Sequence, residues 1–217
     1  MNYYVGVSFS FSVGIAAVIG WIRFKKIDST YFPFLYIIWI GFITEIISYI
    51  ITNKGYSNGV LYNIYVLVEA IFITWQFRKW QLFEKRPILY FTIQVSYLLF
   101  WFIECFYFHY IYFTASNFRL YDSFIIVLMS INIINSELIR ENRSVFKNPV
   151  FLICVAFVIY YIYKVIVGIF RVYGLNGSMA FNVHLALFMP YVNLLANLIF
   201  ALAILWMPKK HRFLLRF

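Results

Sequence analysis

Seven long apolar stretches, separated by short polar gaps, occupy nearly all of this 217-residue chain. An apolar helix needs about 20 residues to cross the ~30 Å hydrocarbon core of a bilayer. A helix is favoured there because it pairs its own backbone polar groups, which lipid cannot do. The chain is therefore predicted to be an all-α integral membrane bundle of seven transmembrane helices, at residues 3–22, 33–52, 60–77, 88–108, 119–138, 149–170 and 182–206.

The composition agrees with this pattern. Hydrophobic residues make up 64% of the chain and charged residues 12%, whereas soluble domains are about half apolar and about a quarter charged. Because the spans leave no room for a separate soluble domain, we expect one transmembrane domain over residues 1–217. A net charge of +10 would suggest nucleic acid as the partner of a soluble protein. Here we interpret it as a topology signal beside anionic lipid, and expect membrane lipid but no nucleic acid as a partner.

The basic residues fall almost entirely in every second gap between the spans. Three follow the first span, four the third and three the fifth, and four lie in the tail, so that fourteen share one side: Arg23, Lys25, Lys26, Arg78, Lys79, Lys85, Arg86, Arg140, Arg143, Lys147, Lys209, Lys210, Arg212 and Arg216. The other side holds Lys54, Arg119 and Arg171. Since cytoplasmic loops are enriched in Lys and Arg, the N-terminus is predicted to lie outside and the C-terminus in the cytoplasm. The bias toward Ile, Phe, Tyr, Asn and Lys fits an AT-rich bacterial genome, so the chain is expected to be a multi-pass protein of a bacterial inner membrane.

Four ionisable side chains are predicted to lie within the spans: Glu45, Glu69, Glu104 and Lys164. A charge at the centre of a bilayer costs about 3 kcal/mol on insertion scales, so such residues are usually functional. We interpret Glu69 as the partner of Lys164. In the simpler alternative, these groups only pair with one another and hold the helices together.

Further polar residues share helical faces with these charges or with one another. Tyr65 precedes Glu69 by one helical turn, and Tyr160 precedes Lys164 by one turn, so each pair points the same way. The predicted ligand-binding or proton-coupling residues are Glu45, Glu69, Glu104, Lys164, Tyr65, Tyr160, Asn193 and Asn197. In the first span, the small residues Gly6, Ser10, Gly14 and Ala17 share a face that is suited to close helix packing.

The depth of the charges suggests how they are solvated. Glu45, Glu104 and Lys164 fall past the midpoints of their outward-running spans. Water reaches such a cluster at low cost only if the bundle is open on that side. We therefore expect an outward-facing cavity inside the bundle, in preference to a dry buried network.

The sequence lacks the motifs of several common classes of enzyme and cofactor-binding protein. The sequence has no H-E-x-x-H, no G-x-S-x-G and no Walker loop, so no catalytic residue is assigned. His109, His184 and His211 are too scattered to indicate a metal site, and Cys105 and Cys154 lie within apolar spans. The seventh span has no lysine, the residue that holds retinal in rhodopsins, so no cofactor is expected.

The leading hypothesis is a membrane protein that binds, and transports, a small polar or zwitterionic solute. Glu69 and Lys164 would bind the solute or couple to protons, and the other predicted residues would line the cavity. One alternative is a ligand-sensing or accessory subunit that signals to a separate partner protein through the basic tail at 209–217. A less favoured one is an intramembrane acid–base enzyme that uses two of the glutamates.

Overall fold

The computed structural model describes residues 3–108, 110–113, 116–140, 147–173 and 178–209, and within these ranges it is helical with no β-strand. Short 3-10 turns lie at Phe24–Lys26 (η1), Ser29–Tyr31 (η2) and Tyr110–Tyr112 (η4), and a π-helical turn at Ile103–Tyr107 (η3). The α-helices are α1 (Tyr3–Ser10), α2 (Val13–Arg23), α3 (Phe32–Asn53), α4 (Gly59–Lys79), α5 (Pro87–Phe102), α6 (Ser116–Arg140), α7 (Pro149–Tyr173) and α8 (Met179–Trp206). Arg143 and the tail from Lys210 onward, which contribute to the predicted charge pattern and partner contact, lie outside the described residues.

Among the described residues, seven helical segments are long and apolar enough to cross a bilayer: Gly6–Lys26, Ser29–Asn53, Gly59–Lys79, Pro87–Tyr107, Ser116–Ile139, Pro149–Phe170 and Val183–Trp206. The prediction of an all-helical chain with seven such helices is confirmed. Pro87 and Pro149 each begin a helix, where a missing backbone N–H costs nothing. The fifth segment starts three residues earlier than predicted, at Ser116, so Arg119 lies at the end of its first turn instead of at its first position.

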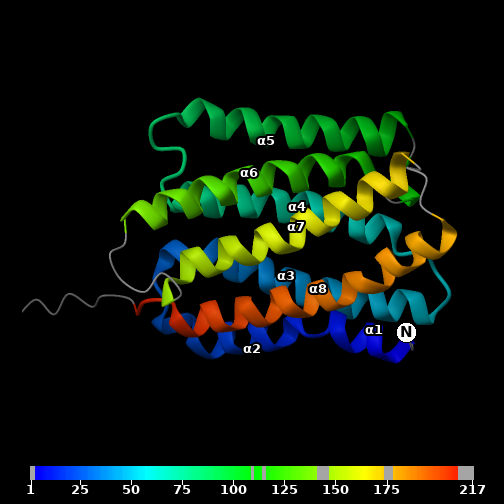
Figure 1. The fold of residues 1–217 in the computed structure, drawn as a ribbon, viewed down its shortest axis with the longest axis horizontal. Coiled ribbons are helices and arrows are strands. Elements are labelled where there is room, and N and C mark those ends of the chain that lie inside the picture. The colour runs from blue at the N-terminus through cyan, green and yellow to red at the C-terminus, as the bar shows by residue number, and fades with distance from the viewer. Residues whose placement is uncertain (1–2, 109, 114–115, 141–146, 174–177, 210–217) are drawn as a thin grey trace, which may run out of the picture.

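Six of the spans form a closed ring, and the seventh lies outside it. Each of α2, α3, α4, α6, α7 and α8 contacts the next in this order, and α8 contacts α2 again (Figure 1). Helix α5 packs on the outside against α4 and α6. In its most apolar window 17% of the residues are buried within the bundle, the smallest share among the seven described spans. The ring therefore encloses the interior without help from α5.

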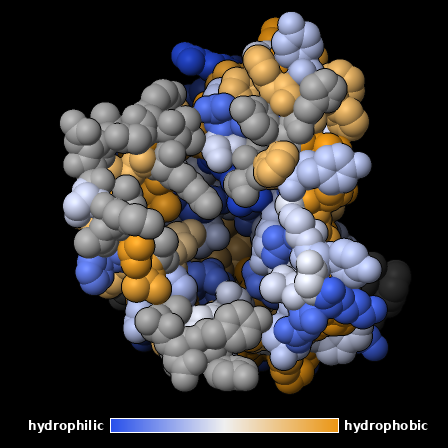
Figure 2. All heavy atoms as spheres, turned by 90° about the vertical axis from the view of Figure 1, so that its right-hand side faces the viewer, coloured by the Kyte–Doolittle hydropathy of each residue, from blue (hydrophilic) through white to orange (hydrophobic). Residues whose placement is uncertain are grey.

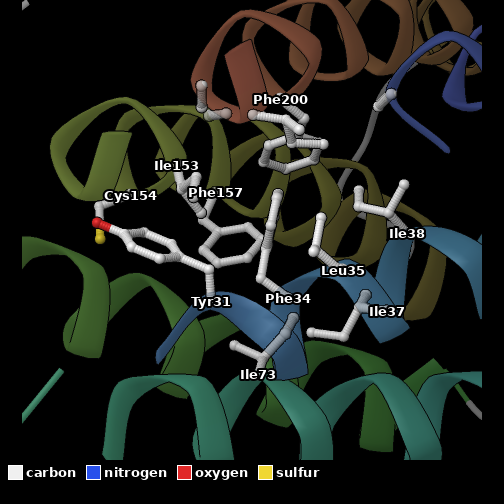
Figure 3. Close-up of a cluster of buried hydrophobic side chains, with 14 of the residues drawn as sticks. Tyr31, Phe34, Leu35, Ile37, Ile38, Ile73, Ile153, Cys154, Phe157 and Phe200 are labelled. Carbon is white, nitrogen blue, oxygen red and sulfur yellow. The ribbon is translucent and has the colours of Figure 1, made fainter. Parts of the chain in front are cut away.

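Interlocking aromatic rings fill one half of the ring's interior. The centroid of Phe200 lies 5.3 Å from that of Phe34 and 5.4 Å from that of Phe157, both in edge-to-face contact (Figure 3). Ile73 and Phe77 of α4 are fully buried in the same cluster. Since lipid is as apolar as these side chains, close van der Waals packing rather than the hydrophobic effect holds them together. This half of the bundle is densely packed.

The ends of the first and last spans are joined beside this aromatic cluster. The Arg23 guanidinium donates to the carbonyls of Ile204 and Met207, the latter at 3.1 Å. The backbone N–H of Asp28 donates to the carbonyl of Pro208 at 3.2 Å. The carbonyls of Met207 and Pro208, beyond the last residue of α8, thereby gain partners, and the Arg23 side chain fixes α2 against α8.

The first span is a broken helix instead of the continuous one predicted over 3–22. At the break between α1 and α2, backbone bonds shift to the i−3 spacing, as in the 2.9 Å bond from the Gly14 N–H to the Phe11 carbonyl. The Ser12 hydroxyl donates to the Phe9 carbonyl at 2.6 Å and accepts from the Asn197 side chain at 2.8 Å. A serine that bonds its own backbone in this way bends helices. Gly14, on the small face predicted for this span, packs closely against α3, since a Cβ there would lie 2.8 Å from the Phe42 ring, whereas Ser10 of the same face lines the cavity described below.

At the opposite end of the bundle, the connection between α5 and α6 is fastened onto α4. The Asn63 side chain donates to the carbonyls of Ile111 (3.0 Å) and Phe113 (2.5 Å), and Trp101 donates to the Asn63 carbonyl at 2.8 Å. Gly59 lies so close to the backbone carbonyl of Tyr112 that a Cβ would overlap it. This docking fixes where α6 begins.

Substitution Gly59→Ala is expected to destabilise the protein by about 1–3 kcal/mol, because the new methyl group meets backbone atoms that cannot turn away. The measurement is thermal unfolding of the purified chain in detergent. Ile64→Ala, on the exposed face of the same helix, is the matched control and should change the midpoint little. Equal midpoints for Gly59→Ala and the unaltered chain would show that this connection is not tightly docked.

Candidate functional site

A cavity of about 320 Å³ lies within the ring, between the aromatic cluster and the end of the bundle that carries the N-terminus. Figure 2 shows this end hollowed between the helices, with hydrophilic residues in the hollow. Phe34, Phe157 and Phe200 belong to both the aromatic cluster and the cavity wall, so they form its floor. At ~30 Å³ per water molecule, the cavity has room for about ten waters.

Seven of the eight predicted site residues line this one cavity: Glu45, Glu69, Lys164, Tyr65, Tyr160, Asn193 and Asn197. They come from α3, α4, α7 and α8. The polar stripes of these helices thus face a common space instead of forming separate buried contacts. The eighth residue, Glu104, does not line the cavity.

Glu104 instead caps the N-terminus of α6. Its carboxylate accepts from the backbone N–H groups of Asn117 (3.0 Å) and Phe118 (2.5 Å) and from the Asn117 side chain (3.3 Å). The first N–H groups of a helix have no partner within it, and a carboxylate also complements the positive end of the helix dipole. The prediction of a cavity role for Glu104 assumed a straight α-helix. The π-helical turn at Ile103–Tyr107 and the earlier start of α6 place it against the helix end instead.

Lys164 and Glu69 form the predicted ion pair. The Nζ–Oε2 distance is 3.9 Å, and the two side chains are 13% and 9% exposed. Lys164 also lies over the rings of Tyr161 (4.6 Å) and Tyr160 (5.3 Å). The other oxygen of Glu69 accepts from the Tyr65 hydroxyl at 2.9 Å. A separation of 3.9 Å is too long for a hydrogen bond, so the ammonium group keeps donors for water or for a solute.

Glycine at position 41 makes room for the tyrosine that supports this pair. A Cβ at Gly41 would lie 3.1 Å from the Tyr65 hydroxyl oxygen. A methyl group at this position would require the phenol to shift by a few tenths of an ångström. A small residue in α3 therefore sets the position of a hydrogen-bond donor in α4.

A second carboxylate, Glu45, is also approached by a tyrosine hydroxyl. The Tyr62 hydroxyl lies 3.4 Å from each of its two oxygens, which is long for an O–H···O bond. Within the described part of the chain, Glu45 has no cation within 4.0 Å. Most of its capacity to accept hydrogen bonds is therefore left for other groups.

Arg119 is a charged residue of the cavity wall that the sequence did not assign to the site. The charge pattern counted it among the residues outside the membrane, whereas it lies in the first turn of α6 and lines the cavity. Its guanidinium carbon is 5.9 Å from the centroid of the Tyr62 ring. The buried Nε has no hydrogen-bond partner, and the group has no carboxylate within 4.0 Å among the described residues. Ser116 is a typical residue for a helix start, and it was the available signal that the span begins before Arg119.

The two asparagines of α8 connect the cavity to the break in the first span. The Asn197 side chain donates to the Ser12 hydroxyl at 2.8 Å and to the Asn193 side-chain oxygen at 3.4 Å. Asn197 is buried, with 5% of its surface exposed. These contacts fasten α8 to the first span at the depth of the cavity.

The chemistry available in the cavity is that of charges and hydrogen bonds. No cluster of three or more His, Cys, Asp or Glu side chains suited to a metal occurs in the described residues. No family model, curated protein or solved structure matches this chain.

The ion pair between Lys164 and Glu69 should make the two residues thermodynamically coupled. We expect Lys164→Met and Glu69→Gln each to lower the unfolding midpoint, because each leaves the opposite group without its partner. The double variant should recover stability, with a coupling energy of roughly 0.5–3 kcal/mol. Thermal unfolding in detergent measures all four proteins of the cycle. Strictly additive losses would mean that the two groups do not interact.

Removing the helix cap should affect stability but leave the cavity chemistry intact. Glu104→Ala is expected to cost about 0.5–2 kcal/mol, the usual price of losing an N-terminal cap. Glu104→Asp, which keeps the charge on a shorter side chain, should lose less. A Glu104→Ala protein with unchanged stability would argue against the capping role.

Proposed function

We propose that this chain is a multi-pass protein of a bacterial inner membrane that binds a small polar or zwitterionic solute in the cavity and carries it across. The proposal rests on the observation that charged side chains of opposite sign share one cavity. Among the described residues, two carboxylates and two cations line one hollow of about 320 Å³, and one opposite-charge pair of them lies within 4.0 Å.

The incomplete pairing favours a binding site over a purely structural network. Charges that only hold helices together are expected to pair closely, because each unsatisfied group in a low-dielectric interior is costly. Here Arg119 and Glu45 line the cavity with no opposite charge within 4.0 Å among the described residues, and the Lys164–Glu69 contact is loose. The volume lies at the low end of the range for ligand pockets, about 300–1,000 Å³, so it suits a small solute.

The charge distribution supports an outward-facing cavity. The cavity lies toward the end of the bundle that carries the N-terminus. The fourteen basic residues in alternate gaps favour an outside location for that end. The aromatic floor would then separate the solute from the cytoplasm.

Inward release requires the floor to open, and bending is cheap in α8, which carries Phe200 of the floor, and in the first span, which is bonded to α8. The first span is broken at Ser12, which is bonded to Asn197 of α8. Pro190, inside α8, lacks the N–H that would continue the helical hydrogen bonds. The Glu69–Lys164 pair is the group best placed to link such a movement to proton uptake, since protonation of Glu69 would release Lys164.

A sensor would use the same cavity differently. It would bind the solute without moving it, and would pass a helix shift to a separate protein. Solute flux through liposomes that contain only this chain separates the two functions, because a sensor binds without flux.

The test uses purified chain in liposomes and a panel of labelled amino acids, amines and sugars. The unaltered chain should accumulate at least one of them, and Glu69→Gln should lower that uptake by about ten-fold or more, equivalent to the loss of about 1.4 kcal/mol of interaction. Glu84→Gln, in the exposed turn between α4 and α5, is the control for a lost carboxylate and should transport normally. Normal uptake by a folded Glu69→Gln protein would contradict the proposed coupling, and binding without flux would favour the sensor.

A further inference from the structure

The charges that line the cavity are balanced but not fully paired. Within the part of the chain that the structure describes, they are Glu45, Glu69, Arg119 and Lys164. Glu69 and Lys164 are each other's partner at 3.9 Å. One carboxylate and one guanidinium remain, and neither has an opposite charge within 4.0 Å.

Tyr62 lies in contact with both remaining charges. Its hydroxyl lies 3.4 Å from both oxygens of Glu45, and its ring faces the Arg119 guanidinium at 5.9 Å. Glu45 is on α3, Tyr62 on α4 and Arg119 on α6, so three consecutive helices of the ring present an anion, a phenol and a cation. The phenol is a spacer between two charges that do not meet.

Both groups have hydrogen-bonding capacity to spare. A guanidinium has five N–H donors in a planar fork that matches a carboxylate, and the buried Nε of Arg119 has no partner. A carboxylate accepts up to about four hydrogen bonds, whereas Glu45 has the one long contact to Tyr62. Asp122, one turn beyond Arg119, attracts the guanidinium but is fully buried and is not part of the cavity wall.

We infer that the solute is a zwitterion, which binds Arg119 through its carboxylate and Glu45 through its ammonium group. This inference rests on the proposed function and makes its ligand specific. A simple amine would satisfy Glu45 and leave Arg119 unpaired, and a simple carboxylate would do the reverse. A zwitterion satisfies both and adds no net charge to an interior where charge is costly. The Lys164–Glu69 pair then couples transport to protons, and Arg119 and Glu45 are the main binding groups for the solute.

The cavity size limits the zwitterion to a small molecule. The cavity volume of about 320 Å³ equals that of about ten water molecules. A space of this size suits an amino acid better than a peptide. Met189 and Val167 also line the cavity and offer an apolar surface for a side chain.

The experiment compares the binding of a zwitterion with that of the matching amine and the matching carboxylic acid. The twenty common amino acids and glycine betaine are tested on the purified full chain by thermal shift. The best zwitterion is then titrated calorimetrically beside the amine that lacks its carboxylate and the acid that lacks its amine. We expect the zwitterion to bind at least about ten-fold more tightly than either half, because each half leaves one buried charge unpaired.

Two variants assign the ends of the molecule. Arg119→Gln should abolish the preference for the zwitterion over the amine, and Glu45→Gln should abolish its preference over the acid. Arg119→Lys keeps the charge without the planar fork and should retain part of the preference, which provides a second test if Arg119→Gln does not fold. Lys54→Gln, an exposed cation outside the cavity, should change nothing.

The outcomes separate this inference from the proposed function. An amine or an acid that binds as tightly as the matching zwitterion overturns the inference. So does a chain that binds or transports only neutral polar solutes such as sugars, although the proposed solute site then stands. A chain that binds no solute and gives no flux in liposomes overturns both.

Discussion

Hydrocarbon cannot solvate a charge, and the arrangement of this bundle, whose described residues include seven helices apolar enough to span a bilayer, meets that constraint. Every polar stripe must turn toward another helix or toward water. Six spans satisfy this by closing into a ring around a shared interior, which is aromatic in one half and polar in the other. Helix α5 lies outside, with most of its apolar surface unburied. The cavity is thus a consequence of excluding charge from lipid, as well as a site in its own right.

Within the cavity, the Lys164–Glu69 pair organises its surroundings. Its two side chains come from α7 and α4, on opposite sides of α6 in the ring. Two tyrosine rings flank the ammonium group, and a tyrosine hydroxyl holds the carboxylate. That hydroxyl has its position because residue 41 lacks a side chain. A buried pair contributes little net stability, so its value lies in fixing the geometry of neighbouring groups.

The sequence was sufficient for the seven spans and for seven residues of the cavity wall. Lipid acts on every residue of a span, so spans and polar faces appear as periodic patterns. Glu104 and Arg119 escaped this reasoning because their positions depend on where α6 begins and on a π-helical turn, and neither has a periodic signature. The bond between Ser12, at the break in the first span, and Asn197 joins residues 185 positions apart, and a contact at that separation leaves no local mark.

The contact between α2 and α8 has a consequence for biosynthesis. A ring that is closed by its first and last members stays incomplete until the final span has left the ribosome and entered the bilayer. Until then, the wall that carries Glu69, Lys164 and Arg119 is open on the side that α8 closes. In a bilayer that open side would place charges against hydrocarbon, which is costly, so the contact between α2 and α8 is the last one needed to shelter them.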